Sequence, residues 1–353
     1  RPAPGAVTSQ WLFFPGCQLS ASSPGRTQQV YTYFSQKLDG GVGLLLHCCG
    51  IPADWAGRKD LFQTALDEIS QQHDEMGRPS VILACSSCYQ VFKQNLPDIK
   101  IVSLWEILDQ LGLPPNLLQH NSAPVSIHDP CSSRHEPQVH ASVRHLLDQA
   151  GYQIEELPLS REKTTCCSYG GEMWLANPEL SQKVVKRRIN DSPLDYITYC
   201  AVCRDFFAMR GKRALHLLDL IWGNDYDKCA TRRAPDYSLR HANRIHLKKQ
   251  LLKEIWGEDM PIQNSYESIQ LIIPEAVRLI LEQRLILEED IQQVIEYAEK
   301  SGSRLRQPQN QHFLAHYRPN RVTYWVEYTR NGDAYEIHNA YSHRMVVKEE
   351  MKK

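Results

Sequence analysis

The sequence predicts an α/β protein built from two pseudo-symmetric domains with parallel sheets, followed by a smaller α+β module. Three observations predict this architecture. Short apolar segments alternate with stretches of helical periodicity over the first two thirds of the chain. Ten of the eleven cysteines form a pattern that occurs twice. The last third contains an alternating segment that runs into Asn331-Gly332, a strong hairpin signal.

The length and charge of the chain limit what it can be. Its 353 residues are enough for two or three domains of ~150 residues each. Forty Lys and Arg against 41 Asp and Glu give a net charge of -1, which argues against nucleic-acid binding. No apolar run approaches the ~18 residues that a membrane span needs, and no segment resembles a signal peptide. We therefore expect a cytoplasmic protein with no nucleic-acid partner and no membrane span.

The cysteines define an internal repeat. The first five read C-x30-CC-x35-C-x2-C and the second five read C-x34-CC-x32-C-x2-C. The first set is Cys17, Cys48, Cys49, Cys85 and Cys88, and the second set is Cys131, Cys166, Cys167, Cys200 and Cys203. Corresponding cysteines are 114 to 118 residues apart, which is the length of a duplicated domain. Cys229 stands outside the pattern, and we expect it to have no part in the site.

Each cysteine group follows a segment with the character of a strand. These segments are residues 11–14, 42–46 and 80–84 in the first repeat, and 125–127 and 196–199 in the second. The counterpart of 42–46 is 161–165, which is much more polar and is the weakest match. Helical periodicity over 61–69, 139–147 and 178–189 separates the strands.

This order has a geometric consequence for the thiols. The carboxyl ends of parallel strands meet at one edge of a sheet, where loops converge and ligands bind. Five thiols from three separate loops are therefore expected to meet at one place in each domain. A helix that follows each C-x2-C motif also directs its positive N-terminal end towards the thiols, which favours their deprotonation.

Several chemistries use clustered thiols. A C-x2-C pair alone fits a redox dithiol or half of a zinc site. Zinc takes four ligands in a tetrahedron, and cubane iron–sulfur clusters take four cysteines. Five cysteines exceed either set by one, and this excess occurs twice. An ordinary structural metal site does not explain it.

The pattern resembles the cysteine-rich CCG domain, named after a cysteine pair followed by glycine, which is present as Cys48-Cys49-Gly50. Tandem copies are similar to the B subunit of heterodisulfide reductase. The same domain occurs in iron–sulfur subunits of glycolate, lactate, glycerol-3-phosphate and some succinate dehydrogenases. The resemblance covers about residues 10 to 224 and predicts a first CCG domain over 10–120 and a second over 121–228. The second pair reads Cys166-Cys167-Ser168 and departs from the motif by its missing glycine.

The resemblance implies cofactors and a ligand set. In the reductase, each complete motif uses all five cysteines to bind a non-cubane [4Fe-4S] cluster. Carried over, this implies two such clusters, one held by each of the two cysteine sets given above. The clusters would face each other, with the sulfur substrate between them.

The resemblance also implies an activity. It indicates an oxygen-sensitive iron–sulfur enzyme subunit of anaerobic metabolism that cleaves or forms a disulfide, or a related sulfur bond. The substrate would be a small disulfide or a protein disulfide. The chain lacks the C-x2-C-x2-C-x3-C runs of ferredoxins. We therefore expect an electron-donor subunit with ferredoxin-type clusters or a flavin, or a donor region upstream.

Two other functions stay open at this point. One is a non-catalytic electron-transfer subunit of a flavin dehydrogenase of the glycolate, lactate or succinate type. The other is an interaction scaffold with structural zinc, which metal analysis would distinguish.

Two histidines and one acid lie beside the cysteines. His47 and His128 are candidate proton donors for a leaving thiolate, because imidazole titrates near neutral pH. The alternative is that each bonds loop backbone or a cluster sulfur. Asp129-Pro130 precedes Cys131 and is expected to fix that loop.

The last third shows no chemistry of its own. Residues 229–259 are predicted to form a basic helical linker, with an apolar face that includes Leu247 and Leu251. Residues 260–353 are predicted to form a small α+β module of unknown role. Its two helices, over 266–301, would cover a sheet of two or three strands that contains the hairpin at Asn331-Gly332.

Overall fold

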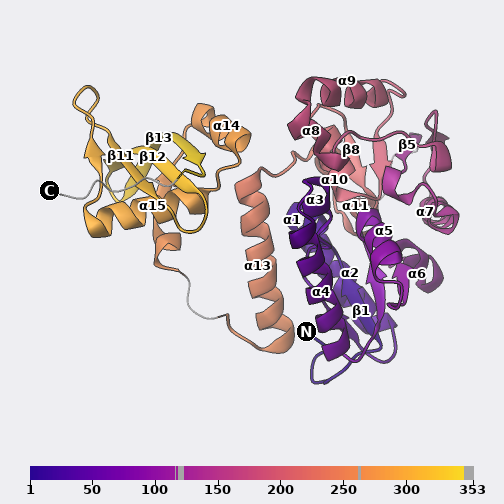
Figure 1. Ribbon diagram of the computed structural model, residues 1–353. Coiled ribbons are helices and arrows are strands. Elements are labelled where there is room, and N and C mark those ends of the chain that lie inside the picture. The colour runs from indigo at the N-terminus through magenta and orange to yellow at the C-terminus, as the bar shows by residue number, and fades with distance from the viewer. Residues whose placement is uncertain (116, 118–122, 261–263, 346–353) are drawn as a thin grey trace. The chain divides into compact units, whose positions relative to one another are not determined.

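The computed structural model describes residues 1–115, 117, 123–260 and 264–345, and these form two compact units (Figure 1). The first unit contains residues 1–235 and 243–258, and the second contains 236–242 and 259–353. The long helix α13 (Tyr237–Trp256) contributes residues to both units. The domain boundaries drawn from the sequence stay predictions.

The first repeat folds as a parallel α/β domain. Its elements are β1 (Trp11–Phe14), α1 (Cys17–Ser22), α2 (Pro24–Lys37), β2 (Val42–Leu44), α3 (Ile51–Trp55), α4 (Lys59–Glu75), β3 (Ser80–Leu83), α5 (Ser86–Asn95), β4 (Ile101–Ser103) and α6 (Leu104–Leu111). The strand order is β2-β1-β3-β4, and all three pairings are parallel. The chain reverses its direction across the sheet between β1 and β3, the position where such sheets bind ligands.

The second repeat has the same architecture. Its elements are β5 (Val125–His128), η1 (Cys131–Ser133), α7 (Pro137–Gln149), β6 (Ile154–Glu156), η2 (Arg161–Lys163), η3 (Gly170–Glu172), α8 (Met173–Ala176), α9 (Pro178–Ile189), β7 (Tyr196–Thr198), α10 (Ala201–Ala208), β8 (Ala214–His216), α11 (Leu217–Trp222) and α12 (Tyr226–Thr231). The order β6-β5-β7-β8 is again parallel throughout and matches that of the first sheet. The predicted pair of parallel-sheet domains is thus confirmed.

One strand lies elsewhere than the repeat comparison suggested. The counterpart of β2 is β6 at Ile154–Glu156, not the segment 161–165, which instead contains the short helix η2. A loop of nine residues, 157–165, joins β6 to the second cysteine pair. The misplacement arose because β6 is short and carries two exposed glutamates, so it lacks the apolar run that marks a buried strand.

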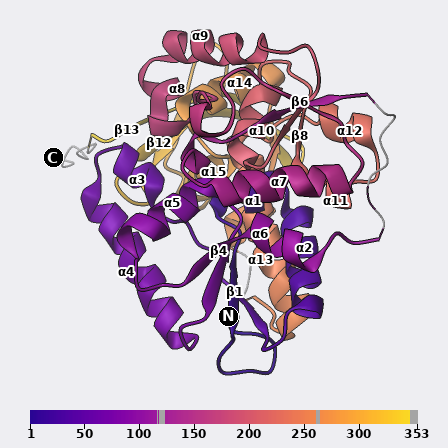
Figure 2. The same ribbon diagram turned by 90° about the vertical axis from the view of Figure 1, so that its right-hand side faces the viewer.

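A single apolar core holds the two domains together. Alternating side chains of β1 divide between two layers, with Phe13 on one face and Leu12 and Phe14 on the other. The Phe13 face belongs to a cluster that includes residues of α2, α6, α7 and α11, and therefore spans both repeats. The opposite face packs under α4 and α5; Figure 2 shows α4 and α2 on opposite sides of β1.

The second unit is a mixed α+β module. Its elements are η4 (Ser265–Ser268), β9 (Gln270–Ile272), α14 (Glu275–Arg284), α15 (Glu288–Ser301), β10 (Leu305–Arg306), β11 (Phe313–Tyr317), β12 (Thr323–Asn331) and β13 (Ala334–His343). The hairpin of β12 and β13 at Asn331-Gly332 is confirmed. The sheet has five described strands in the order β10-β11-β12-β13-β9, so the prediction of two or three was too low. The first helix begins at Glu275 rather than near 266.

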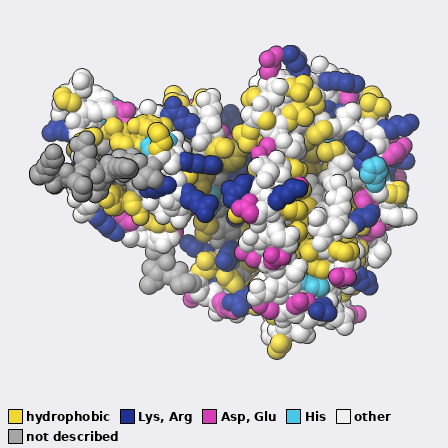
Figure 3. Space-filling view, viewed as in Figure 1, with side chains coloured by type: hydrophobic (Ala, Val, Ile, Leu, Met, Phe, Trp, Pro, Cys, Tyr) yellow, Lys and Arg dark blue, Asp and Glu magenta, His cyan; other side chains and the backbone are white. Residues whose placement is uncertain are grey.

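The surface and helices agree with the composition. Basic and acidic side chains are interspersed over the face of the first unit seen in Figure 3. No helix in the described parts of the chain has the length and apolar character needed to cross a bilayer.

Candidate functional site

The predicted meeting of the thiols is present as one cavity in the first unit. The cavity has a volume of about 430 Å³. Nine of the ten repeated cysteines line it, and Cys48 is the one that does not. Both cysteine sets therefore open onto the same space, because each set lies at the carboxyl ends of its own parallel strands.

Two equivalent contacts between the domains orient the two cysteine sets towards each other. Helix α5 follows Cys85 and contacts η1 of the second domain, where the hydroxyl of Ser87 lies 3.3 Å from that of Ser132. In the same way, α1 contacts α10, and the Ser22 hydroxyl donates to Asp205 Oδ1 at 2.9 Å. Each helix that follows a C-x2-C motif thus packs on the segment that begins at the other domain's first cysteine.

The second set has closely spaced sulfur atoms. The Sγ atoms of Cys131 and Cys166 are 3.8 Å apart, and those of Cys167 and Cys203 are 3.3 Å apart. Two thiolates on one tetrahedral metal, each with a bond of about 2.3 Å, are about 3.8 Å apart. The backbone N–H of Ser168 also donates to Cys166 Sγ at 3.1 Å, as it would to a negatively charged sulfur.

Two glycines let the backbone pack closely around the first set of cysteines. A Cβ atom on Gly16 would lie 3.2 Å from Cys88 Sγ, so the backbone approaches this thiol closely. Gly50 has φ +81°, and a Cβ there would lie 2.9 Å from both Ala65 Cβ and Phe62 Cδ2 of α4. The glycine of the CCG motif therefore lets the loop turn against α4, while its N–H lies 3.5 Å from Cys48 Sγ.

Helix N-termini add positive potential to the cavity. Cys85 is the N-cap of α5 and Cys200 is the N-cap of α10. The pKa of Cys85 is lowered to about 7, because the Cys88 thiol and the backbone N–H groups of Cys88 and Ser87 donate to its sulfur. A thiolate is the form that binds a metal.

Hydrogen bonds between the other thiols shift their pKa values in opposite directions. The pKa of Cys48 lies far below its usual value because the thiols of Cys17 and Cys49 donate to it. The pKa of Cys17 lies well above it, through the same hydrogen bond with Cys48 and through burial. The second set repeats this arrangement, with the Cys166 pKa lowered by its neighbours and the Cys131 pKa raised. Without a cation, only part of each set can ionise.

The donor set fits a polynuclear iron–sulfur group. Thiolates are the usual ligands of such clusters, and the thiols line a wide hollow rather than surround one point. Among the described residues, no group of three or more His, Cys, Asp or Glu side chains is arranged around a single ion.

The other walls of the cavity come from residues that the sequence did not single out. Ile51, Pro52 and Trp55 line it from the first domain, and Tyr169 and Arg134 line it from the second. Arg134 follows η1 and donates to the Thr164 carbonyl at 2.8 Å. The sequence did carry one signal for these walls, an aromatic residue shortly after each cysteine pair, which is Trp55 in the first repeat and Tyr169 in the second.

Neither candidate histidine is among the residues that line the cavity. His47 contacts the Cys48 carbonyl through Nδ1 at 2.8 Å and Glu68 through Nε2 at 3.0 Å. His128 is fully buried, and its Nδ1 accepts from Arg188 at 3.2 Å. Burial and the nearby Arg188 charge lower its pKa to about 3, so the ring is neutral at pH 7 and is a poor proton donor. The donor role of either histidine stays a prediction.

Fold and site together define a protein with two parallel α/β cysteine-rich domains, whose cysteine sets both line one cavity. Residues 11–93 and 125–205 each match the family described as CCG, the cysteine-rich domain. The chain carries two copies of this family's domain, as the cysteine spacing predicted.

The relatives are redox proteins. The chain is 26% identical over 222 residues to an EtfAB:quinone oxidoreductase of Syntrophomonas wolfei, which covers 56% of this chain and 31% of that protein. It is 24% identical over 205 residues to an uncharacterised iron–sulfur protein of Methanococcus maripaludis, covering 54% and 39%. Over 159 residues it is 24% identical to the D subunit of the dihydromethanophenazine:CoB–CoM heterodisulfide reductase of Methanosarcina acetivorans, covering 41% and 39%.

These comparisons define a class and leave the reaction open. The chain spans less than half the length of each of these relatives. It is a CCG protein related to iron–sulfur oxidoreductases, among them the D subunit of heterodisulfide reductase. A glutamate racemase of Bacillus anthracis aligns with a TM-score of 0.28 at 10% identity, too low to indicate a shared fold.

Gly50 offers a test of how tightly the first cysteine pair is packed. Gly50→Ala should lower the free energy of unfolding by about 1–3 kcal/mol more than Gly57→Ala, because only the first substitution drives a methyl group into α4. Gly57 is the matched control, since it has φ +71° and open space around it. Urea denaturation of the reduced, metal-free variants measures both, and equal losses would contradict the packing argument.

The lowered pKa of Cys85 predicts its pH dependence. In the reduced, metal-free protein the thiol should become a thiolate as the pH rises through about 7, below the usual value for cysteine. Alkylation rates followed by mass spectrometry should therefore rise between pH 6 and 8, as expected for a thiol of about this pKa. Cys229 provides the internal comparison because burial raises its pKa. A Cys85 thiol that reacts only above pH 9 would contradict the assignment.

Proposed function

We propose that this chain is an iron–sulfur oxidoreductase subunit that cleaves or forms a disulfide, or a related sulfur bond, inside the shared cavity. The observation that carries the proposal is that nine of the ten repeated cysteines, from both sets, line one cavity. A substrate held there would touch both sets at once. The relationship to a component of heterodisulfide reductase supports this reaction over other redox chemistry.

Each set of five cysteines would hold one cluster. We assign one non-cubane [4Fe-4S] group to the first set and one to the second, following the family resemblance. When bound, these groups supply single electrons and an iron site that can accept sulfur. Reduction of a disulfide then consumes two electrons and two protons, and releases two thiols.

The chain's own residues supply electrostatics to this reaction. The N-terminal ends of α5 and α10 stabilise thiolate ligands. The backbone N–H of Ser168 donates to Cys166 and so helps to set the charge on that sulfur. Arg134 brings a positive charge to the lining of the cavity, and it favours a substrate with negative charge.

Apolar residues form part of the cavity walls. The indole of Trp55 lies 3.8 Å from where a side chain on Gly170 would begin, so the two domains meet in a close contact beside the thiols. Ile51, Pro52 and Val202 add apolar surface. Apolar walls lower the local dielectric constant and so strengthen electrostatic interactions with the reacting sulfur atoms.

Electrons would come from another protein or subunit. The chain contains no ferredoxin-type cysteine run, and all ten repeated cysteines belong to the two sets. We propose a donor that carries ferredoxin-type clusters or a flavin, in line with relatives that are named as a component of a reductase and as a quinone oxidoreductase.

The second candidate is an electron relay without chemistry of its own. The relationship to an EtfAB:quinone oxidoreductase favours it, since that reaction passes electrons between separate partners. The shared cavity favours catalysis, because a relay does not require both clusters to face an open space.

Iron analysis tests the ligand assignment. An anaerobically prepared sample should hold about eight iron atoms per chain, whereas structural zinc would give about two zinc atoms and no iron. Cys49→Ser and Cys167→Ser should each lower the iron content to about four atoms and remove the spectrum of one cluster. Cys229→Ser is the matched control and should leave the content at about eight. If both spectra survive either ligand substitution, the assignment is wrong.

Exposure to disulfides separates catalysis from relay. The reduced protein is mixed anaerobically with a panel of small symmetrical and mixed disulfides and with an oxidised thioredoxin-type protein. At least one disulfide should change the electron paramagnetic resonance spectrum, because an open iron site accepts sulfur. The corresponding thioethers, which have no S–S bond, are the control. Indifference across the whole panel would support the relay.

A further inference from the structure

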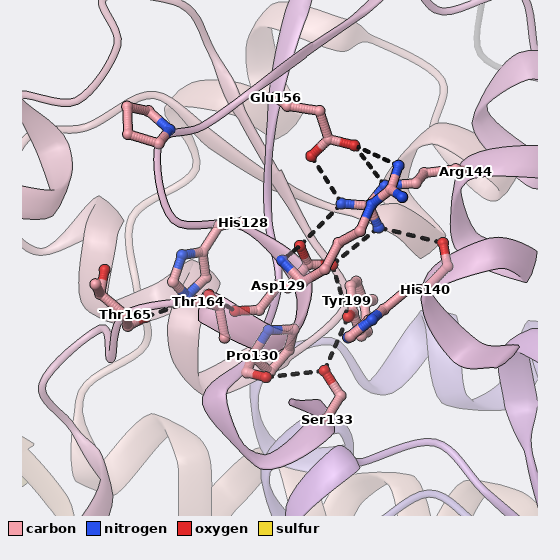
Figure 4. A network of polar contacts seen from close by, with 12 residues as sticks. His128, Asp129, Pro130, Ser133, His140, Arg144, Glu156, Thr164, Thr165 and Tyr199 are labelled. Atoms are coloured by element: carbon pink, nitrogen blue, oxygen red, sulfur yellow. Dashed lines mark hydrogen bonds and ion pairs between the residues drawn. The ribbon is translucent and has the colours of Figure 1, made fainter. Parts of the chain in front are cut away.

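The loops of the second cysteine set are joined by a buried polar network centred on Asp129 (Figure 4). We propose that Asp129 is a positioning residue that fixes three of these loops together, and that, of the two repeats as the structure describes them, the second alone has such a device. The role in metal binding rests on the proposed function, whereas the role in placing the thiols does not.

The carboxylate of Asp129 joins four segments of the domain. It is fully buried, and Arg144 of α7 donates to both of its oxygens at 3.0 and 2.9 Å. The backbone N–H of Arg161 donates to Oδ2 at 2.8 Å, and the Tyr199 hydroxyl donates to Oδ1 at 2.9 Å. All four acceptor contacts use charge-assisted hydrogen bonds, which are stronger than neutral ones.

Three of these segments lead to a cysteine. Asp129 lies two residues before Cys131, and Tyr199 directly precedes Cys200. Arg161 begins the turn that leads into the pair Cys166-Cys167. One carboxylate therefore sets the relative positions of the loops that carry the first cysteine, the cysteine pair and the C-x2-C motif of this set.

Further bonds hold the same loops. The Thr164 hydroxyl donates to the Asp129 carbonyl at 2.7 Å, and the Ser133 hydroxyl bonds to both the Pro130 carbonyl and Tyr199. Glu156 of β6 pairs with Arg144 at 2.6 Å and with Arg161 at 3.1 Å, so two arginines face two carboxylates in the network. Figure 4 shows Arg144 and Tyr199 directed towards Asp129, with Glu156 on the far side of Arg144.

The corresponding positions of the first domain carry no such carboxylate. Pro15 occupies the position two residues before the first cysteine, and Phe14 occupies that of His128. Phe14 is fully buried and packs edge to face on Phe92. His128 makes the equivalent contact with Phe207. The two domains therefore share this aromatic contact and differ in the carboxylate, so a change at Asp129 should affect one set alone.

The test compares Asp129→Ala and Asp129→Asn with a matched control. The amide of Asn has the same shape as the carboxylate, but it lacks the charge and turns an N–H towards the donors of Arg144 and Arg161. Asp195→Asn is the control, because Asp195 makes a bidentate pair with Arg213 in the same domain, just before β7 and away from the cysteines.

The first measurement uses reduced, metal-free protein. Mass spectrometry gives the alkylation rate of each cysteine. In both Asp129 variants the rates should rise about tenfold for the second set and stay within about twofold for the first set and Cys229, as expected for local opening. Asp195→Asn should match the unmodified chain. Equal acceleration of both sets, or none, would overturn the proposal.

The second measurement uses anaerobic protein loaded with iron. Asp129→Ala should hold about four iron atoms per chain rather than about eight, and should lose the spectrum of one cluster. Full loading with unchanged spectra would overturn the role of Asp129 in metal binding. If the unmodified chain takes up no iron but alkylation changes as expected, the proposed function fails while the positioning of the thiols stands.

Discussion

The structure depends on one electrostatic constraint. Ten thiols lie close together, and without a cation they cannot all be ionised at once. Sulfur atoms as near as those of Cys167 and Cys203, at 3.3 Å, repel strongly when both carry charge in a buried site. The pKa values show how the metal-free protein meets this constraint. The pKa of Cys48 in one set and of Cys166 in the other is strongly lowered because neighbouring thiols donate hydrogen bonds to the sulfur, and the pKa values of Cys17 and Cys131 are raised. The pKa of Cys85 is lowered to a smaller extent. Ionisation of all the thiols in a set therefore requires positive charge nearby, which iron would supply.

The two domains meet this constraint by different means on the same fold. In the first, Gly16 and Gly50 bring backbone close to the thiols, so the geometry follows from the absence of side chains. In the second, the Cys-Cys-Ser sequence lacks that glycine, and Ser168 itself takes a positive φ of +81°. The buried pair of Asp129 and Arg144 supplies the bonds that hold such a loop in place. Duplication has kept the positions of the sulfur atoms and changed the forces that fix them.

Much of this arrangement could be read from the sequence, for physical reasons. Cysteine spacing after apolar strands places thiols at the carboxyl edge of parallel sheets, and the structure has both sheets and the shared cavity. Strand β6 was misplaced because an edge strand with exposed glutamates carries no apolar signal. The strands β9 and β10 of the second unit are short and mostly exposed, so they were missed for the same reason. Arg134 was missed because only the fold brings its side chain to the cavity beside the thiols of both domains.

The shape of the cavity helps to distinguish a catalytic protein from one that only transfers electrons. Electron transfer between two clusters needs proximity, and it works through closely packed protein that encloses each cluster separately. Here the two sets line one hollow of about 430 Å³, which has aromatic and apolar walls and the charged side chain of Arg134. A molecule that fits there would contact thiols of both domains together, as the proposed cleavage of one bond by two single electrons requires.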